Sequence, residues 1–165
     1  MTGSQTPSPS PDPAPQRTAE RCAAALLAGD RASAGLGITL DAVAPGFARL
    51  RMTVRSDMLN GHGICHGGLL FALADTAFAV ACNTYEAATV AAAGAIEFLR
   101  PAHAGEELTA EARERWRSRR SGIYDITVTG EAGRTVALLR GRSHCLAQAV
   151  TPPAPEADAP AQRGR

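Results

Sequence analysis

A single acid, Asp75, interrupts the apolar run in the stretch "NGHGICHGGLLFALADTAFAVACN" (60–83). If this run is a helix, the neighbours of Asp75 on its own face include Phe71, Phe78 and two alanines, and none of them is a cation. An unpaired carboxylate is unfavourable in such surroundings, and its pKa is raised there. Asp75 therefore either takes a solvent-facing position or acts as a general base or nucleophile in a dry cleft, and the apolar face favours the catalytic role.

The residues just before this run are suited to polarise a carbonyl group. His66, Gly67 and Gly68 would begin the helix, where free backbone N–H groups meet the positive end of the helix dipole. Glycines also let a ligand approach the backbone closely. These features suit a carbonyl oxygen that becomes an oxyanion during acyl transfer, whereas a tight turn alone would also account for the glycines.

Helix geometry separates Gly67 from Asp75. The two residues would lie about 12 Å apart along a helix that rises about 1.5 Å per residue. A base acts within about 3 Å of its target or through one water molecule. Asp75 therefore cannot serve a carbonyl held at Gly67 of its own chain, and we expect an active site shared by two chains with antiparallel helices across a dimer interface.

Two polar side chains complete the candidate site. The amide of Asn60 could orient a water molecule or the acid, and His66 could contact the acyl carbonyl or fix the loop, although a lone histidine is more often structural. The sequence thus predicts Asp75, Gly67, Asn60 and His66 as catalytic residues. It predicts Gly68 as a substrate contact.

Metal and cysteine chemistry are weaker alternatives. A zinc site would draw on His62, Cys65 and His66, with His103, His144 or Cys145 as further ligands. This spacing matches no familiar zinc pattern, so no metal is predicted. Cys65 stands in no recognisable order with a histidine and an Asp or Asn, and it is interpreted as a small loop cysteine rather than a nucleophile.

Arginines recur at every second position in "EARERWRSRR", at 113, 115, 117 and 119, so on a strand they would share one face. That face could be a solvated surface or a charged dimer edge. It could also bind phosphates, because guanidinium groups pair well with them. We expect Arg115 and Arg117, together with Arg100, to bind the substrate, and Arg140 and Arg142 could add to them.

Composition excludes several classes of protein. The net charge is +1 and the pI is near 7.7, so the sequence gives no electrostatic case for binding nucleic acid or a membrane surface. All seventeen basic residues are arginines, which excludes a Schiff-base lysine. The four cysteines are widely spaced and no signal peptide or membrane span is apparent, so we expect a cytoplasmic protein with reduced thiols.

The order of predicted elements indicates an α+β fold. Residues 18–30 are typical of a short amphipathic helix, 37–54 of a hairpin around Pro45-Gly46, and 67–83 of a long buried helix. Four strands are predicted at 89–101, 106–120, 122–130 and 134–148. A curved antiparallel sheet wrapped around the long helix, the hot-dog fold, satisfies this order and leaves an edge for a second subunit. We expect disordered Ser/Pro-rich or Pro/Ala-rich tails at 1–16 and 151–165, flanking one domain at 17–150.

The stretch 60–83 closely resembles the signature of the phenylacetate-degradation thioesterases, the PaaI family of hot-dog proteins. The segment "TVAAAGAIEFLRPAHAGEELTAEA" (89–112) is similar to the part of that family after the helix, and the resemblance covers about 37–148. It implies hydrolysis of acyl-CoA thioesters, typically aryl-acetyl or hydroxylated aryl-acetyl ones, by a homotetramer built from two dimers, with no cofactor besides the CoA of the substrate.

The resemblance also implies roles for single residues. Asp75 matches the catalytic carboxylate and Gly67 the residue whose N–H polarises the thioester carbonyl. Asn60 and His66 match residues that line the site, with Asn60 and Gly67 facing Asp75 of the partner subunit. The alanines at 91–93 depart from relatives that carry a Ser or Thr there, which puts the water-positioning partner in doubt. A non-catalytic hot-dog module that binds acyl-CoA is the alternative function, and a hot-dog hydratase is a third.

Overall fold

The computed structural model describes residues 13–151. In chain order its elements are α1 (Pro13–Gly29), α2 (Arg31–Leu36), β1 (Thr39–Ala44), β2 (Phe47–Thr53), α3 (Gly67–Cys82), β3 (Ala87–Phe98), β4 (Glu107–Arg117), β5 (Ser121–Thr129) and β6 (Thr135–Ala149), with 3-10 turns at Ser56–Met58 and Glu131–Gly133. The predicted hairpin, long helix and four later strands are all confirmed.

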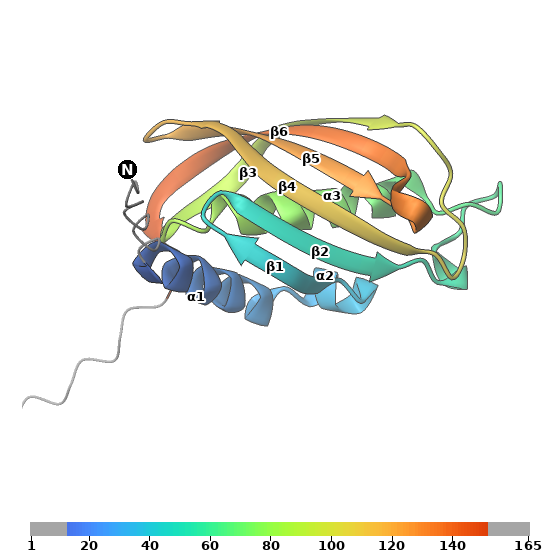
Figure 1. Ribbon diagram of the computed structural model, residues 1–165, viewed down its shortest axis with the longest axis horizontal. Helices are drawn as coiled ribbons and strands as arrows, with labels where there is room; N and C mark the ends of the chain where they lie inside the picture. The colour runs from blue at the N-terminus through green and yellow to red at the C-terminus, as the bar shows by residue number, and fades with distance from the viewer. Residues whose placement is uncertain (1–12, 152–165) are drawn as a thin grey trace, which may run out of the picture.

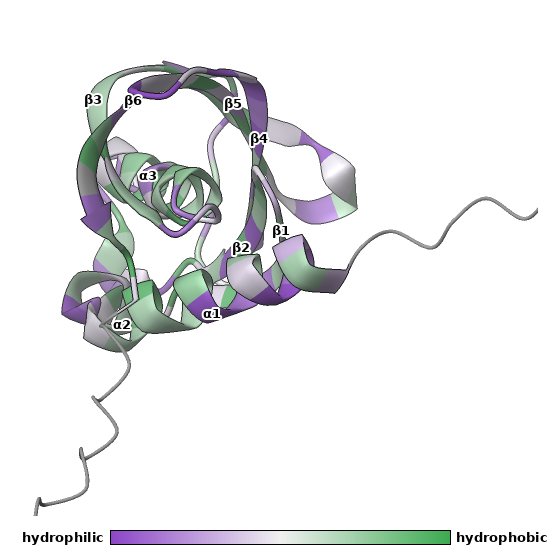
Figure 2. Cartoon of the chain, turned by 90° about the vertical axis from the view of Figure 1, so that its left-hand side faces the viewer, coloured by the Kyte–Doolittle hydropathy of each residue, from purple (hydrophilic) through white to green (hydrophobic). Residues whose placement is uncertain are grey.

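The strands form one six-stranded antiparallel sheet in the order β1-β2-β4-β5-β6-β3. Figure 2 shows this sheet curled around α3, with α1 and α2 below it near β1 and β2. The side chains that β2, β4 and β5 alternately turn inward are buried, as a sheet with one covered face requires. The predicted α+β hot-dog fold is therefore confirmed.

The central helix α3 packs closely against the inner face of the sheet. The rings of Phe78 on α3 and Tyr124 on β5 pack with centroids 5.3 Å apart. Gly141 on β6 leaves room for Phe78, because a Cβ atom at Gly141 would lie 2.7 Å from that ring. Larger residues at position 141 would push α3 away from the sheet.

The N-terminal helices differ from the expectation. α1 begins within the predicted tail, at Pro13, since proline is well tolerated in the first turn of a helix. α2 was not predicted; Asp30 caps its first turn through the N–H of Ser33, 2.9 Å away, and Gly37 ends it with a φ of 72°. Of the tails predicted at 1–16 and 151–165, residues 1–12 and 152–165 lie outside the described part of the chain.

Strand β3 is unusual because one chain leaves it largely uncovered. It is the last strand of the sheet, so one of its edges has no neighbouring strand among residues 13–151. Val90 and Phe98 are 45% and 53% exposed, and the alanines between them are exposed as well. An edge strand with bare apolar side chains is a template for pairing with another chain.

Candidate active site

The loop that precedes α3 is held by the side chain of Asn60. Its Oδ1 accepts hydrogen bonds from the backbone N–H groups of His62 (2.9 Å) and Ile64 (3.4 Å). The backbone of Asn60 also bonds Ile64 and Gly63, and Gly63 has a φ of 72°, which glycine adopts without strain. Because Oδ1 is committed to the loop, the NH2 group of Asn60 stays available as a donor to a ligand.

The first turn of α3 leaves one backbone donor free. His66 is the N-cap, and its Nδ1 accepts a hydrogen bond from the N–H of Gly68 at 3.0 Å. Across residues 13–151, the N–H of Gly67 has no hydrogen-bond partner. The N–H of Gly67, the predicted oxyanion donor, is thus open, whereas the N–H of Gly68 is occupied by the cap. The role of Gly68 as a substrate contact stays a prediction.

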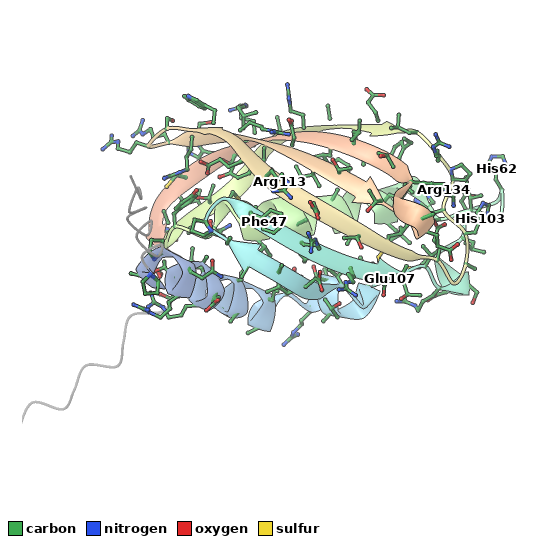
Figure 3. The ribbon with its side chains drawn as sticks, viewed as in Figure 1. Phe47, His62, His103, Glu107, Arg113 and Arg134 are labelled. Carbon is green, nitrogen blue, oxygen red and sulfur yellow. The ribbon has the colours of Figure 1, made fainter. Side chains whose placement is uncertain are left out.

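Gly67 and Asn60 open onto one cavity of about 530 Å³. Its walls are mainly apolar and come from the loop, α3 and the end of β3: Asn60, Ile64, Cys65, Gly67, Leu70, Phe98, Leu99, Arg100 and Pro101. Figure 3 shows His62 and His103 at this end of the molecule. An apolar cavity with a few convergent polar groups is the usual form of a small-molecule site.

Asp75 lies on the side of α3 that the sheet does not cover. It is half-buried, as are Ala72 and Ala79 one turn away on either side. Its carboxylate has no hydrogen bond or ion pair within the described part of the chain. Burial raises its pKa above the ordinary value. The expected lack of a cation is confirmed, but the single chain leaves Asp75 partly open to solvent rather than enclosed.

Gly67 and Asp75 do not meet within one chain. Both belong to α3, so the helix holds them about 12 Å apart along its axis. Asp75 is also absent from the lining of the cavity that contains Gly67 and Asn60. The structure therefore brings Asn60 and Gly67 together at one cavity, whereas Asp75 lies outside it on a different part of the surface of α3.

The raised pKa of Asp75 predicts how stability depends on pH. When the pKa of a carboxyl group is higher in the folded than in the unfolded state, the protein loses folding stability as the pH rises through the folded-state pKa. Below the unfolded-state pKa the group is protonated in both states and does not destabilise the fold. Asp75→Asn should therefore raise the melting temperature at neutral pH, and the difference should vanish near pH 3. Thermal unfolding at both pH values checks this.

Asp57→Asn is the matched control. The Arg55 guanidinium lowers the pKa of Asp57, so the sign is reversed: this variant should lose stability at neutral pH and approach the wild type in acid. A melting-temperature difference for Asp75→Asn that is the same at both pH values would contradict the raised pKa.

The alternative chemistries gain no support from the geometry. Among residues 13–151, no group of three or more His, Cys, Asp or Glu side chains is placed to hold a metal ion. Cys65 is buried, and its burial together with the nearby Glu106 carboxylate raises the pKa of the thiol, which disfavours a nucleophilic thiolate. In the same range no helix has both the length and the apolar character needed to cross a bilayer.

The predicted arginines separate into different places. Arg100 lines the cavity of Gly67, and no carboxylate pairs with it in the described chain. The prediction that the arginines of β4 share one face is wrong, because a β-bulge between Glu114 and Trp116 reverses the alternation. Arg115 bonds Asp125 at 2.8 Å on the outer face of the sheet, whereas Arg117 stacks on the ring of Tyr85 at 3.8 Å.

Comparison with known proteins decides the family. Residues 62–137 match the family model described as the thioesterase superfamily. Acyl-coenzyme A thioesterase PaaI of Escherichia coli is 48% identical over 127 residues, which make up 77% of this chain and 91% of that protein. The chain belongs to the thioesterase superfamily.

Solved structures of this superfamily agree with the fold. The structure of E. coli PaaI, from the phenylacetic acid degradation operon, matches with a TM-score of 0.80 and 46% identity, covering 81% of this chain and 97% of that one. A mutant of the phenylacetic acid degradation protein PaaI of Thermus thermophilus matches with a TM-score of 0.67 and 41% identity, covering 70% and 98%. The resemblance to the PaaI family is confirmed.

Phe98 was missed as a site residue of this thioesterase. Its ring lies against Gly67, because a Cβ atom at Gly67 would be 3.1 Å from Phe98 Cζ. The signal in the sequence was an aromatic residue at the end of a strand, directly before Leu99 and Arg100. Thr89 has the hydroxyl nearest in the sequence to the missing Ser or Thr at 91–93, and its Oγ1 donates to the carbonyl of Ala87.

Proposed function

We propose that this protein hydrolyses acyl-CoA thioesters to a free acid and coenzyme A. The observation that carries the proposal is the open N–H of Gly67, which faces an apolar cavity beside the free amide donor of Asn60. A carbonyl oxygen that gains negative charge needs such a donor, and hydrolysis also needs a base, which Asp75 supplies. The similarity to a protein named acyl-coenzyme A thioesterase supports a thioester as the substrate.

Four residues then take part in the reaction or hold the site in place. The Gly67 N–H donates to the thioester oxygen as it becomes an oxyanion, and Asn60 donates to this oxygen or to the attacking water. Asp75 accepts a proton from the water, whose oxygen bonds to the carbonyl carbon, or attacks that carbon itself. The C–S bond breaks and the thiolate of coenzyme A leaves, later taking up a proton. Where Asp75 is the nucleophile, water then hydrolyses the mixed anhydride to the free acid and restores the carboxylate. His66 holds the first turn of α3 in place as its cap.

The acid and the oxyanion donor come from two subunits in this proposal. The bare edge of β3 lies next to α3, where Phe71 is 3.5 Å from the position of a Cβ atom on Gly94. Pairing of two β3 edges would cover this apolar surface and set two α3 helices antiparallel. Asp75 of the partner subunit would then face Asn60 and Gly67. We include a homotetramer of two such dimers in the proposal, since Trp116 and Leu138 stay exposed on the outer face of the sheet.

The cavity favours an aromatic acyl group. Ile64, Leu70 and the ring of Phe98 form its apolar walls, and flat aromatic groups pack well against such rings. The names of the two PaaI relatives refer to phenylacetic acid degradation, which agrees with an aryl-acetyl substrate. We propose phenylacetyl-CoA or hydroxyphenylacetyl-CoA, with Arg100 at the cavity wall attracting the anionic part of the substrate.

Phe98→Ala should change acyl preference. We expect kcat/KM for phenylacetyl-CoA to fall about tenfold relative to acetyl-CoA, because a ring contact contributes about 1.4 kcal/mol. Steady-state kinetics with both substrates measures the ratio. Phe47→Ala is the control, since Phe47 lies under Arg113 on another face, 4.6 Å from its guanidinium carbon (Figure 3). Equal losses for both acyl groups would show that Phe98 does not select the acyl chain.

The direct test is release of free thiol. The protein is incubated with a panel of aryl and fatty acyl-CoA thioesters, and coenzyme A is titrated with a thiol reagent. No release from any of them would overturn hydrolysis in favour of a module that only binds acyl-CoA. The mechanism includes no further cofactor.

We place the reaction in the cytoplasm, because the buried free thiols Cys22, Cys65 and Cys82 suit a reducing compartment.

A further inference from the structure

A basic hollow lies at the opposite end of β3 from the cavity of Gly67. It has a volume of about 750 Å³ and is lined by the start of β3, the turn between β4 and β5, and the end of β6. The lining includes Ala87, Arg117, Arg119, Arg120, His144 and Cys145. In Figure 1 this hairpin turn and the loop before α3 stand at opposite ends of the molecule.

The turn that carries two of these arginines is firmly held. Arg119 and Arg120 are its central residues, because the N–H of Ser118 bonds the carbonyl of Ser121 at 2.8 Å. The hydroxyl of Ser118 accepts from the N–H groups of Arg120 and Ser121. The carbonyl of Arg120 accepts from the N–H of Cys145 at 3.0 Å, which ties the turn to β6. The two guanidinium groups thus project from a fixed base beside His144.

Within residues 13–151, the positive charge of the hollow is largely without nearby carboxylates. In the described chain Arg119, Arg120 and His144 have no ion pair, and Arg117 alone meets a carboxylate, Glu114, at 3.4 Å. No carboxylate of the described residues belongs to the lining. Three guanidinium groups gathered around one space repel each other unless an anion joins them. Phosphate is the anion that guanidinium groups bind best, through paired hydrogen bonds.

Within one chain this hollow is too far from the thioester site to serve it. β3 separates them, and its 12 residues span roughly 36–40 Å at about 3.3 Å per residue. An antiparallel pairing of two β3 edges changes the distance. The start of one β3 then lies beside the end of the other, so Ala87 of one subunit comes next to Phe98 and the cavity of the second.

We infer that the hollow of one subunit binds the phosphate groups of the coenzyme A whose thioester is held at Gly67 of the other subunit. The inference rests on the proposed function and its dimer. It assigns the phosphate contacts to Arg119, Arg120, Arg117 and His144, in place of the outward-facing Arg115. The subunit that supplies Asp75 therefore also supplies the arginines that bind the phosphate groups of the nucleotide.

The test removes the two turn arginines together, as Arg119→Ala/Arg120→Ala. We expect KM for acyl-CoA to rise at least tenfold with little change in kcat, and hydrolysis of the matching acyl-pantetheine to be unaffected. Acyl-dephospho-CoA, which lacks the 3′-phosphate, distinguishes the two phosphate groups. If the arginines bind the 3′-phosphate, variant and wild type should have the same KM for this substrate. If they bind the diphosphate, the KM of the variant should still be at least tenfold higher. Arg17→Ala/Arg31→Ala is the control, since it removes two exposed arginines from α1 and α2.

Binding of coenzyme A by calorimetry separates this inference from the proposed function. If no thioester is hydrolysed but coenzyme A binds at least tenfold more weakly to the variant, hydrolysis fails and the phosphate site stands. If hydrolysis proceeds and the variant keeps the wild-type KM and affinity for coenzyme A, the phosphate site is overturned. An equal rise in KM for acyl-CoA and acyl-pantetheine would also overturn it, because that result indicates a structural effect.

The two-subunit assignment is tested by mixing variant chains. Arg119→Ala/Arg120→Ala chains combined with Gly67→Pro chains should regain the low KM, because one site of each mixed dimer has all of its groups. Combined with Asp75→Asn chains they should keep the high KM, since Asp75 and the arginines come from the same subunit. The reverse pattern would place the arginines on the subunit of Gly67 and contradict the inference.

Discussion

Asp75→Asn lowers kcat for thioester hydrolysis at least a hundredfold, or about 2.7 kcal/mol of transition-state stabilisation. The amide keeps the size and shape of the carboxylate but neither accepts a proton nor attacks a carbonyl carbon. Among residues 13–151 of a single chain, no acid lines the cavity of Gly67 that could take over this role. Thiol release in steady state, with phenylacetyl-CoA at saturation, measures the loss.

The same substitution removes the acid limb of the pH profile. Burial raises the pKa of Asp75. As the pH is lowered, wild-type activity should therefore begin to fall at a higher pH than it would with an aspartate of ordinary pKa as the base. The residual activity of Asp75→Asn has no such limb. Asp57→Asn is the control because this exposed carboxylate lies on a separate turn, paired with Arg55. Wild-type turnover by Asp75→Asn would show that the carboxylate is not the base or nucleophile.

Gly67→Pro is expected to lower kcat about a hundredfold or more, because it deletes the backbone donor of the proposed oxyanion site. The substitution suits the local backbone. Proline is favoured at the first position of a helix, and His66 before it already has the extended conformation that proline requires, with φ −63° and ψ 131°. A loss of activity in a chain that stays folded therefore reports the missing N–H.

Gly67→Ala is the matched control for the side-chain atoms. It adds the same Cβ atom, 3.1 Å from Phe98 Cζ, but keeps the N–H. Phe98 is 53% exposed and has room to turn aside, so this variant should retain most of its activity. Equal losses in the alanine and proline variants would assign the effect to crowding by Phe98 and remove Gly67 from the mechanism.

Mixing Gly67→Pro with Asp75→Asn chains tests the shared site. If acid and donor come from two subunits, each mixed dimer has one intact site, and a random mixture regains about a quarter of wild-type activity. If both groups served one site within a chain, no site would be intact. Properly assembled mixed dimers without activity would contradict the two-subunit arrangement.

Most of the fold follows from local patterns in the sequence. Turn residues such as Pro45-Gly46 separate the strands, and the apolar run after Gly67 is too long for a strand, so both features are readable from neighbours in the chain. α2 was missed although Asp30 and Gly37 are a capping residue and a helix terminator, because six residues carry little periodicity.

The site was less readable where it depends on three-dimensional detail. The bulge at Arg115 leaves no mark in the sequence, and yet it decides which face of the sheet each later arginine takes. The contact of Phe98 with Gly67 joins segments far apart in the chain. The exposed side of Asp75 likewise depends on where the sheet ends, which no local pattern around the acid describes.

The position of both proposed catalytic groups on α3 has a consequence for a dimer. Gly67 and Asp75 share one continuous helix, which the Phe78–Tyr124 contact seats against the sheet. In the proposed arrangement that helix is a rigid rod with each group in a different catalytic centre. Any displacement of the rod along its axis is transmitted to both centres at once, so the two halves of the dimer form one mechanical unit rather than two independent enzymes.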